Sequence, residues 1–213
     1  MNKEDIKLVC FDLNKTLIKE NSWLDLNLAM GVTQEEDDML MCWYEEGVIS
    51  YEEANHILLS MYKKRGLGSR TAILKAISAY TYMPHARELV SYLQQRGYEI
   101  ALITGAMDLL ADKVASELGI TLSAANNIFV FDDEDYVQDL IMFGEDGIAK
   151  RNHLQEFASR LGISLEQCAC IGDGDNDREL FEATGKGITF EGSKISDISW
   201  RVVKELKEVE GIL

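Results

Sequence analysis

The chain has 213 residues, 46% of them hydrophobic, and a formal net charge of −16. This length suits one α/β domain with an insertion, or two small domains, and is enough to bury a core. A chain this acidic repels a polyphosphate backbone, so we expect no nucleic-acid partner. A small phosphorylated substrate remains compatible with a site that holds a cation.

The sequence predicts neither a targeting signal nor a membrane span. Residues 1–7 are charged and lead into a strand-like segment without the apolar core of a signal peptide. No run approaches the roughly 20 apolar residues that a span requires. We therefore expect a cytoplasmic protein with no membrane partner. The four cysteines show no CxxC spacing and are expected to be buried, reduced thiols: Cys10, Cys42, Cys168 and Cys170.

The first predicted strand is the apolar run 8–11, which ends at Asp12. This pattern is typical of a buried parallel strand that delivers one carboxylate to the carboxyl edge of a sheet. Asp12 is therefore a candidate nucleophile. An acidic residue at a strand end is by itself more often a turn former or a helix cap, so the assignment depends on the motifs that follow.

Residues 18–81 are predicted to be helical. Glycine stops, apolar periodicity and two capping boxes, Thr33 with Glu36 and Ser50 with Glu53, mark the helices. The predicted ranges are about 22–30, 33–47, 50–66 and 69–80. Three aromatic residues of this region are expected to pack in the core rather than to line a pocket: Trp23, Trp43 and Tyr44.

From residue 84 onward, predicted helices and strands alternate. Pro84 suits the first turn of a helix that ends near Gly97. The elements that follow are a strand over 98–103, a helix over 109–118, a hairpin of strands over 126–130 and 137–143, a helix over 150–162, a strand over 168–171, a helix over 178–183, a strand over 187–190 and a closing helix over 198–206. This alternation predicts a parallel sheet with a ligand site beyond the carboxyl ends of its strands.

Four motifs fall at that edge: Asp12 with Asn14, then Thr104-Gly105, then Lys150 at the start of a helix, then the loop Gly172-Asp173-Gly174-Asp175-Asn176-Asp177. Each has an ordinary explanation when taken alone, as a turn, a solvated helix residue or a polar loop. In this order and spacing they resemble the four motifs of the haloacid dehalogenase superfamily of aspartate-dependent phosphohydrolases. The helical insertion after the first motif is similar to that of the phosphoserine phosphatase branch.

The resemblance covers nearly the whole chain and implies an α/β fold. A Rossmann-like parallel-sheet core is expected from residues 1–17 and 82–213, with a small helical cap, residues 18–81, inserted after the first strand. It also implies a Mg²⁺-dependent phosphatase that acts on a small phosphorylated metabolite through an aspartyl phosphate at Asp12. A carboxylate nucleophile and a phosphate dianion repel each other, so phosphoryl transfer between them needs positive charge such as that of Mg²⁺.

Roles are carried over by resemblance to the matching positions. Asp12 is expected to be nucleophile and metal ligand, with the backbone carbonyl of Asn14 and the carboxylate of Asp173 as further ligands. Thr104 and Lys150 are expected to bind phosphate. Asp177 is expected to orient Lys150 or a metal-bound water. Substrate binding is assigned to Gly105 and Asn176.

Position 14 departs from the family pattern, in which a second aspartate serves as general acid and base. Losing such a group typically costs about 10²- to 10⁴-fold in rate. Three interpretations stay open: a preference for good leaving groups or a long-lived aspartyl phosphate, a silent protein that binds phosphorylated ligands, or an engineered Asp to Asn change. The first gives a phosphatase with weak activity, and the others give a binding protein on the same fold.

The substrate side also departs from the phosphoserine phosphatase branch. There, a glutamate after the first motif holds the substrate amine and an arginine in the insertion holds its carboxylate. The matching positions are Asn21 and His56, so phosphoserine is not the favoured substrate. His56 lies among apolar neighbours on a predicted helix, where a packed or surface histidine is more common than a ligand.

Overall fold

The apolar run that ends at Asp12 forms the central strand of the sheet. Strand β1 (Leu8–Phe11) is fully buried and pairs in parallel with β2 (Glu99–Met107) on one side and β5 (Cys168–Ile171) on the other. Both faces of β1 are covered, which explains why its sequence is continuously apolar instead of alternating. The computed structural model describes residues 6–213, so part of the charged amino-terminal segment lies outside the described residues.

The sheet has seven strands in the order β4-β3-β2-β1-β5-β6-β7. All neighbours pair in parallel except β3 (Leu122–Phe131) and β4 (Val137–Met142), which form the predicted antiparallel hairpin. Strands β6 (Gly187–Phe190) and β7 (Arg201–Val203) complete the other side. The predicted α/β fold with a mostly parallel sheet is confirmed.

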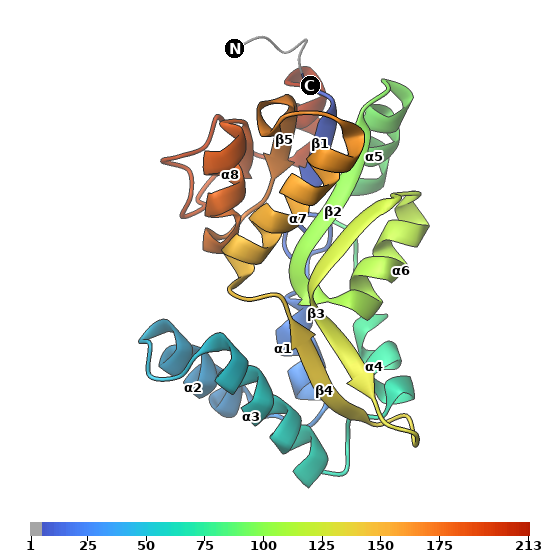
Figure 1. The fold of residues 1–213 in the computed structure, drawn as a ribbon, viewed down its shortest axis with the longest axis vertical. Helices are drawn as coiled ribbons and strands as arrows, with labels where there is room; N and C mark the ends of the chain where they lie inside the picture. Colours follow the sequence, from blue (N-terminus) through green and yellow to red (C-terminus); the bar gives the residue numbers. More distant parts are fainter. Residues whose placement is uncertain (1–5) are drawn as a thin grey trace.

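Helices cover both faces of the sheet. Helices α5 (Ala86–Gln95) and α6 (Asp108–Leu118) share one buried cluster with Val9 and Phe11 of β1. Helices α7 (Asp146–Leu161) and α8 (Arg178–Thr184) share the other with Leu8 and Cys10. Figure 1 shows α5 and α6 to the right, α8 to the left, and α7 in front of the central strands. Successive side chains of one strand thus anchor the two helical layers.

Four more helices gather at one end of the sheet: α1 (Ser22–Ala29), α2 (Gln34–Glu45), α3 (Tyr51–Lys64) and α4 (Arg70–Ile77). Both predicted capping boxes form, at Thr33 and at Ser50. The far end of the β3–β4 hairpin reaches these helices, where Ser69 and Tyr136 form an isolated bridge. We propose the division predicted from the sequence, with a core of residues 1–17 and 82–213 and a cap of residues 18–81.

The predicted closing helix over 198–206 is wrong. Residues Arg201–Val203 form β7, and Leu206–Gly211 form a short 3-10 helix, η4. The backbone N–H of Trp200 donates to the Gly187 carbonyl at 2.8 Å, which starts the pairing of this segment along β6. The free edge of β6 offers these residues hydrogen bonds that a helix would not use, and Val202 and Val203 favour a strand.

Three smaller findings complete the comparison. Helix α7 begins at Asp146, one turn before the predicted start at Lys150. Cys10, Cys168 and Cys170 are free and buried as predicted, whereas Cys42 is exposed. Among residues 6–213, no helix is both long enough and apolar enough to span a bilayer.

Candidate active site

Three neighbouring strands bring the predicted motifs to one edge of the sheet. Phe11 lies beside Leu102 and Ile171 in the parallel register, so the residues that follow these strands lie close together. The backbone N–H of Asp12 donates to the Ile171 carbonyl at 2.9 Å, and its side chain is only 5% exposed. The sheet therefore holds Asp12 as a buried carboxylate beside the loop after β5.

Lys150 lies between two carboxylates. Its Nζ is 2.6 Å from Asp12 Oδ1 and 2.7 Å from Asp177 Oδ1, and its side chain is completely buried. Burial alone lowers the Lys150 pKa, but the two carboxylates outweigh that effect and raise the pKa above its ordinary value. The ammonium group is therefore a fixed positive charge at the sheet edge.

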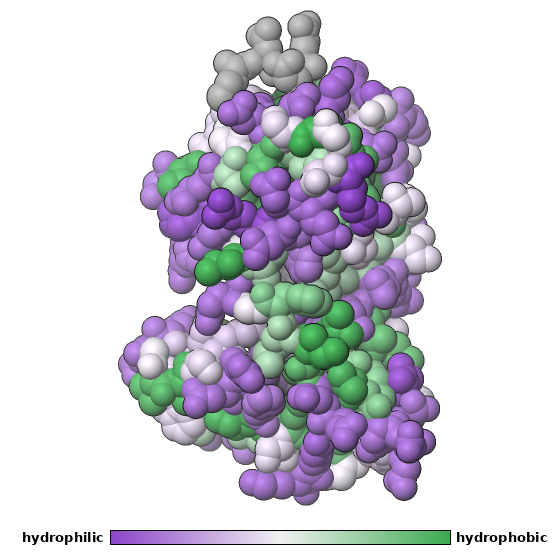
Figure 2. All heavy atoms as spheres, viewed as in Figure 1, coloured by the Kyte–Doolittle hydropathy of each residue, from purple (hydrophilic) through white to green (hydrophobic). Residues whose placement is uncertain are grey.

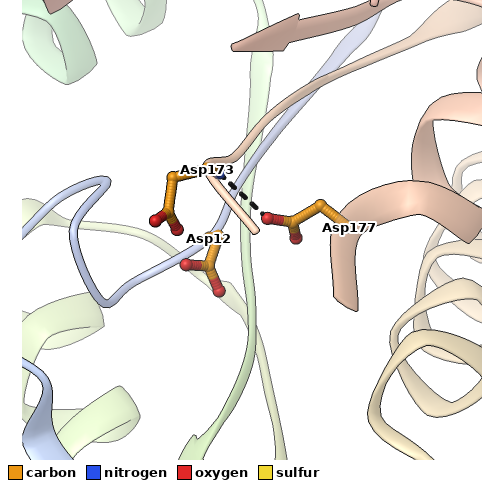
Figure 3. Close-up of side chains that lie close together, drawn as sticks. All are labelled: Asp12, Asp173 and Asp177. Carbon is orange, nitrogen blue, oxygen red and sulfur yellow. Dashed lines mark hydrogen bonds between the residues drawn. The ribbon is translucent and has the colours of Figure 1, made fainter. Parts of the chain in front are cut away.

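The loop after β5 is built around Asp177, which is 1% exposed. Its Oδ2 accepts hydrogen bonds from the backbone N–H groups of Asp173 at 3.1 Å and Gly174 at 3.3 Å. A Cβ at Gly172 would lie 2.2 Å from the same oxygen, so only glycine allows this close approach. Figure 3 shows Asp173 and Asp177 beside Asp12, with the first of these hydrogen bonds drawn.

The carboxylates outnumber the cation that neutralises them. Oxygen atoms of Asp12, Asp173 and Asp177 lie within 4.8 Å of one another. Burial raises the pKa of Asp12 to about 7 against the opposing effect of Lys150, and burial with the nearby Asp177 raises the pKa of Asp173 to about 6. Closely spaced hard oxygen donors with excess negative charge fit a divalent cation.

Thr104 and Gly105 end the inner part of β2 next to this cluster. Thr104 is 1% exposed, and its Oγ1 accepts from the Ala106 N–H at 3.0 Å. The Gly105 carbonyl accepts from the side chains of Trp23 at 3.1 Å and Asn127 at 2.9 Å. A Cβ at Gly105 would lie 2.2 Å from an oxygen of Asp146, so glycine is required here too.

Asn14 connects the site to the cap. Its Oδ1 accepts a hydrogen bond from the backbone N–H of Ser22 at 3.2 Å, at the first turn of α1. Asn21 and Asn176 line the same pocket as Asn14. The structure does not bring His56 to it, because His56 lies on α3 with an exposed side chain whose Nε2 is 3.6 Å from Asp139.

A pocket of about 760 Å³ opens between cap and core, and its lining includes Asp12, Asn14, Thr104 and Asp173. In Figure 2 the surface is indented at the left, where the two parts meet. Trp23 packs against the core as predicted and also lines the pocket, whereas Tyr44 lines the pocket and Trp43 is exposed, which corrects the prediction for these two. The sequence carried no signal for several other lining residues: Tyr51, Asn55, Glu145 and Asp146.

The family model for haloacid dehalogenase-like hydrolases matches residues 9–182. The chain belongs to this family. It is 28% identical over 187 residues to the phosphoserine phosphatase of Methanocaldococcus jannaschii, covering 86% of this chain and 85% of that protein. It is 30% identical over 188 residues to a probable phosphoserine phosphatase of Schizosaccharomyces pombe, covering 86% of this chain and 61% of that protein.

Solved structures agree with these sequence relatives. A phosphoaspartyl-intermediate analogue of a phosphoserine phosphatase superposes with a TM-score of 0.80 at 26% identity, covering 98% of this chain and 99% of that one. A substrate-bound phosphoserine phosphatase gives 0.81 at 26% identity, with 98% of each chain covered. The predictions of this superfamily, of its phosphoserine phosphatase-like branch and of a phosphoric monoester hydrolase are confirmed.

Proposed function

We propose that the chain is a Mg²⁺-dependent phosphatase that acts on a small phosphorylated metabolite through an aspartyl phosphate at Asp12. The observation that carries this proposal is the buried contact of Lys150 with both Asp177 and Asp12, the latter being a residue that lines the pocket. A nucleophilic carboxylate must meet a phosphate dianion there, and a fixed cation reduces the repulsion between them.

In the proposed reaction, a carboxylate oxygen of Asp12 attacks phosphorus and the bond from phosphorus to the leaving oxygen breaks. Water then attacks the same phosphorus, which releases phosphate and restores the Asp12 carboxylate. Lys150 stabilises negative charge, while Thr104 and the Gly105 N–H bind phosphate oxygens. Asp12, Asp173 and the backbone carbonyl of Asn14 would hold Mg²⁺, which supplies further charge neutralisation. Asp177 keeps Lys150 in position.

Asn14 sets which leaving groups the proposed enzyme handles well. Its amide cannot give a proton to a departing alkoxide at neutral pH, so the leaving oxygen must take its proton from solvent. Aryl and acyl phosphates have leaving groups that need no such help. We therefore propose that aryl and acyl phosphates react faster than alkyl phosphates. Alkyl phosphates should react about 10²- to 10⁴-fold more slowly than in an enzyme with the acid in place.

The relatives are named for phosphoserine, and this supports the phosphatase chemistry more than it supports that substrate. At the positions that the resemblance assigns to the substrate amine and carboxylate, this chain has Asn21 and His56, and His56 lies outside the pocket. We therefore assign recognition of the alcohol part of the substrate to other residues that line the pocket.

The test is phosphate release from an aryl phosphate, acetyl phosphate and a panel of alkyl phosphates, with and without Mg²⁺. The unaltered chain is compared with Asp12→Ala and Asn14→Asp. An aspartate at position 14 can accept the same Ser22 N–H hydrogen bond, so this variant should keep the fold. We expect Mg²⁺-dependent turnover of aryl and acetyl phosphates that Asp12→Ala abolishes, and faster alkyl phosphate turnover in Asn14→Asp. Silence of the unaltered chain towards every donor would contradict the proposal, whether or not Asn14→Asp is active.

A further inference from the structure

The pocket beyond the phosphate centre is strongly acidic. Apart from Asp12 and Asp173, its lining includes six carboxylates: Asp37, Glu45, Glu145, Asp146, Asp175 and Glu179. Within the described part of the chain, the only lysine or arginine in the lining is Lys15. Lys15 lies near Asp173, where it opposes the rise in that residue's pKa. The remainder of the pocket therefore offers no cation to a negatively charged substrate group.

Most of these carboxylates lack a protein cation of their own. Asp175 lies 3.6 Å from Arg178, but the other five form no ion pair with any residue in the range 6–213. Burial raises the pKa of Asp146, even though Asn126 donates a 2.5 Å hydrogen bond to its Oδ1. Lys150 also lowers this pKa, but burial outweighs these effects, so a ligand cation beside Asp146 would stabilise its charge.

Two tyrosines stand at the same corner of the pocket. The rings of Tyr44 and Tyr51 have centroids 5.8 Å apart and are tilted by 58°. The Tyr44 hydroxyl donates to Glu145 Oε2 at 2.8 Å, which ties the aromatic pair from α2 and α3 to the residue that precedes α7. Aromatic faces next to carboxylates attract organic cations, because the ring quadrupole and the negative charges act in the same direction.

Asn55 gives a separate indication. Its side chain lines the pocket and is 4% exposed, and its Nδ2 donates to the Tyr51 carbonyl at 3.1 Å and to the Met142 sulfur at 3.2 Å. An ammonium group supplies three donors and no acceptor, so it can donate a hydrogen bond to the Asn55 amide oxygen.

We propose that the pocket selects phosphorylated substrates that carry an ammonium group and no carboxylate, with the ammonium held where Tyr44, Tyr51, Glu145 and Asp146 meet. This inference rests on the proposed phosphatase function and names the substrate class of the same site. A substrate carboxylate would face several like charges, and such juxtapositions are strongly unfavourable in a partly buried pocket. Phosphoserine carries both groups, so the pocket favours its ammonium and disfavours its carboxylate.

Four phosphate monoesters separate the two charges: ethanolamine phosphate has the ammonium alone, phosphoserine has both groups, glycerol phosphate has neither, and phosphoglycolate has the carboxylate alone. Their Kd values are measured by calorimetry on the full chain with Mg²⁺. We expect ethanolamine phosphate to bind at least about tenfold more tightly than phosphoserine or glycerol phosphate, and phosphoglycolate to bind most weakly. Equal Kd values, tighter binding of phosphoserine, or no binding of any compound would overturn the inference.

Variants locate the effect. Glu145→Gln and Asp146→Asn should each reduce the preference for ethanolamine phosphate over glycerol phosphate severalfold. The control Glu52→Gln removes an exposed carboxylate that neighbours Tyr51 but does not line the pocket, and it should leave the preference unchanged. An equal loss in all three variants would show only a general charge effect and would overturn the assigned corner.

Phosphate release followed with an aryl phosphate distinguishes the two proposals. Ammonium-selective binding without any phosphate release would support the substrate class and contradict the phosphatase function. Turnover of the aryl phosphate without ammonium selectivity would do the reverse.

Discussion

At the scale of single residues, Lys150 is the group on which the site depends most. Its ammonium is buried with two carboxylates at 2.6 and 2.7 Å, so each of the three charges is tolerated only because of the others. Isolated buried charges are far more costly than paired ones. The lysine therefore combines a structural role with its proposed part in phosphate binding.

Replacing this lysine should destabilise the protein strongly. Lys150→Met keeps most of the side-chain volume but leaves Asp12 and Asp177 buried without their cation. We expect the free energy of unfolding to fall by about 3–5 kcal/mol, measured by urea denaturation at neutral pH without metal. The control is Lys113→Met, which breaks the exposed pair with Glu117 and should cost much less. Similar losses in both variants would contradict the expectation.

At the scale of elements, helix α3 connects the cap to the pocket. Tyr51 is its first residue and Asn55 lies one turn later, so both depend on the geometry of the helix start. The Ser50 Oγ accepts from the Glu53 N–H at 3.1 Å, and Glu53 Oε2 accepts from the Ser50 N–H at 2.8 Å. This capping box is thus expected to stabilise a wall of the pocket as well as the helix.

Removing a hydrogen bond of this capping box should therefore affect stability and binding together. Ser50→Ala removes one of the two capping hydrogen bonds, and we expect a loss of about 1 kcal/mol in the free energy of unfolding, measured by thermal or urea denaturation. Ligand binding in the pocket should weaken as well. Ser60→Ala is the control, since Ser60 is an exposed residue in the interior of the same helix and alanine is a better helix former. A stability loss in Ser60→Ala equal to that in Ser50→Ala would contradict the stabilising role of the capping box.

At the scale of the whole molecule, excess carboxylate at the sheet edge links stability to pH and to metal. Burial raises the pKa of Asp12 to about 7 and that of Asp173 to about 6 without metal, so the folded protein holds these protons at pH values where the unfolded chain has lost them. The resulting stabilisation is complete below the ordinary carboxyl pKa near 4. It is lost as pH rises toward 7.

A divalent cation should reverse this trend, because it binds the ionised carboxylates of the folded state only. We expect Mg²⁺ to raise the Tm, and to raise it more at pH 7.5 than at pH 5.5. At 100 times its Kd, the ion should add about 2.7 kcal/mol to the free energy of unfolding. The measurement is calorimetric unfolding in EDTA and in Mg²⁺ at both pH values. Asp173→Asn should abolish most of the Mg²⁺ effect. An equal Mg²⁺ effect at both pH values would contradict the pKa argument.

Local sequence patterns were sufficient to predict much of this protein. Apolar runs ending in Asp12, Thr104 and Asp173 predicted which side chains share an edge of the sheet, because the carboxyl ends of parallel strands meet there. The capping boxes and the β3–β4 hairpin were predictable for a different reason, because their hydrogen bonds join residues close in sequence. The resemblance to a family then supplied roles that no single pattern carries.

Other features depended on contacts between distant segments. The burial of Lys150 between two carboxylates, and the pocket corner where Tyr51 and Glu145 meet, arise only when separate helices pack against one sheet. The segment Arg201–Val203 became a strand because β6 had a free edge. Periodicity in a sequence encodes which side of its own element a residue occupies. Which residue of another element lies opposite is decided by packing in three dimensions, and the chemistry of this pocket is decided there too.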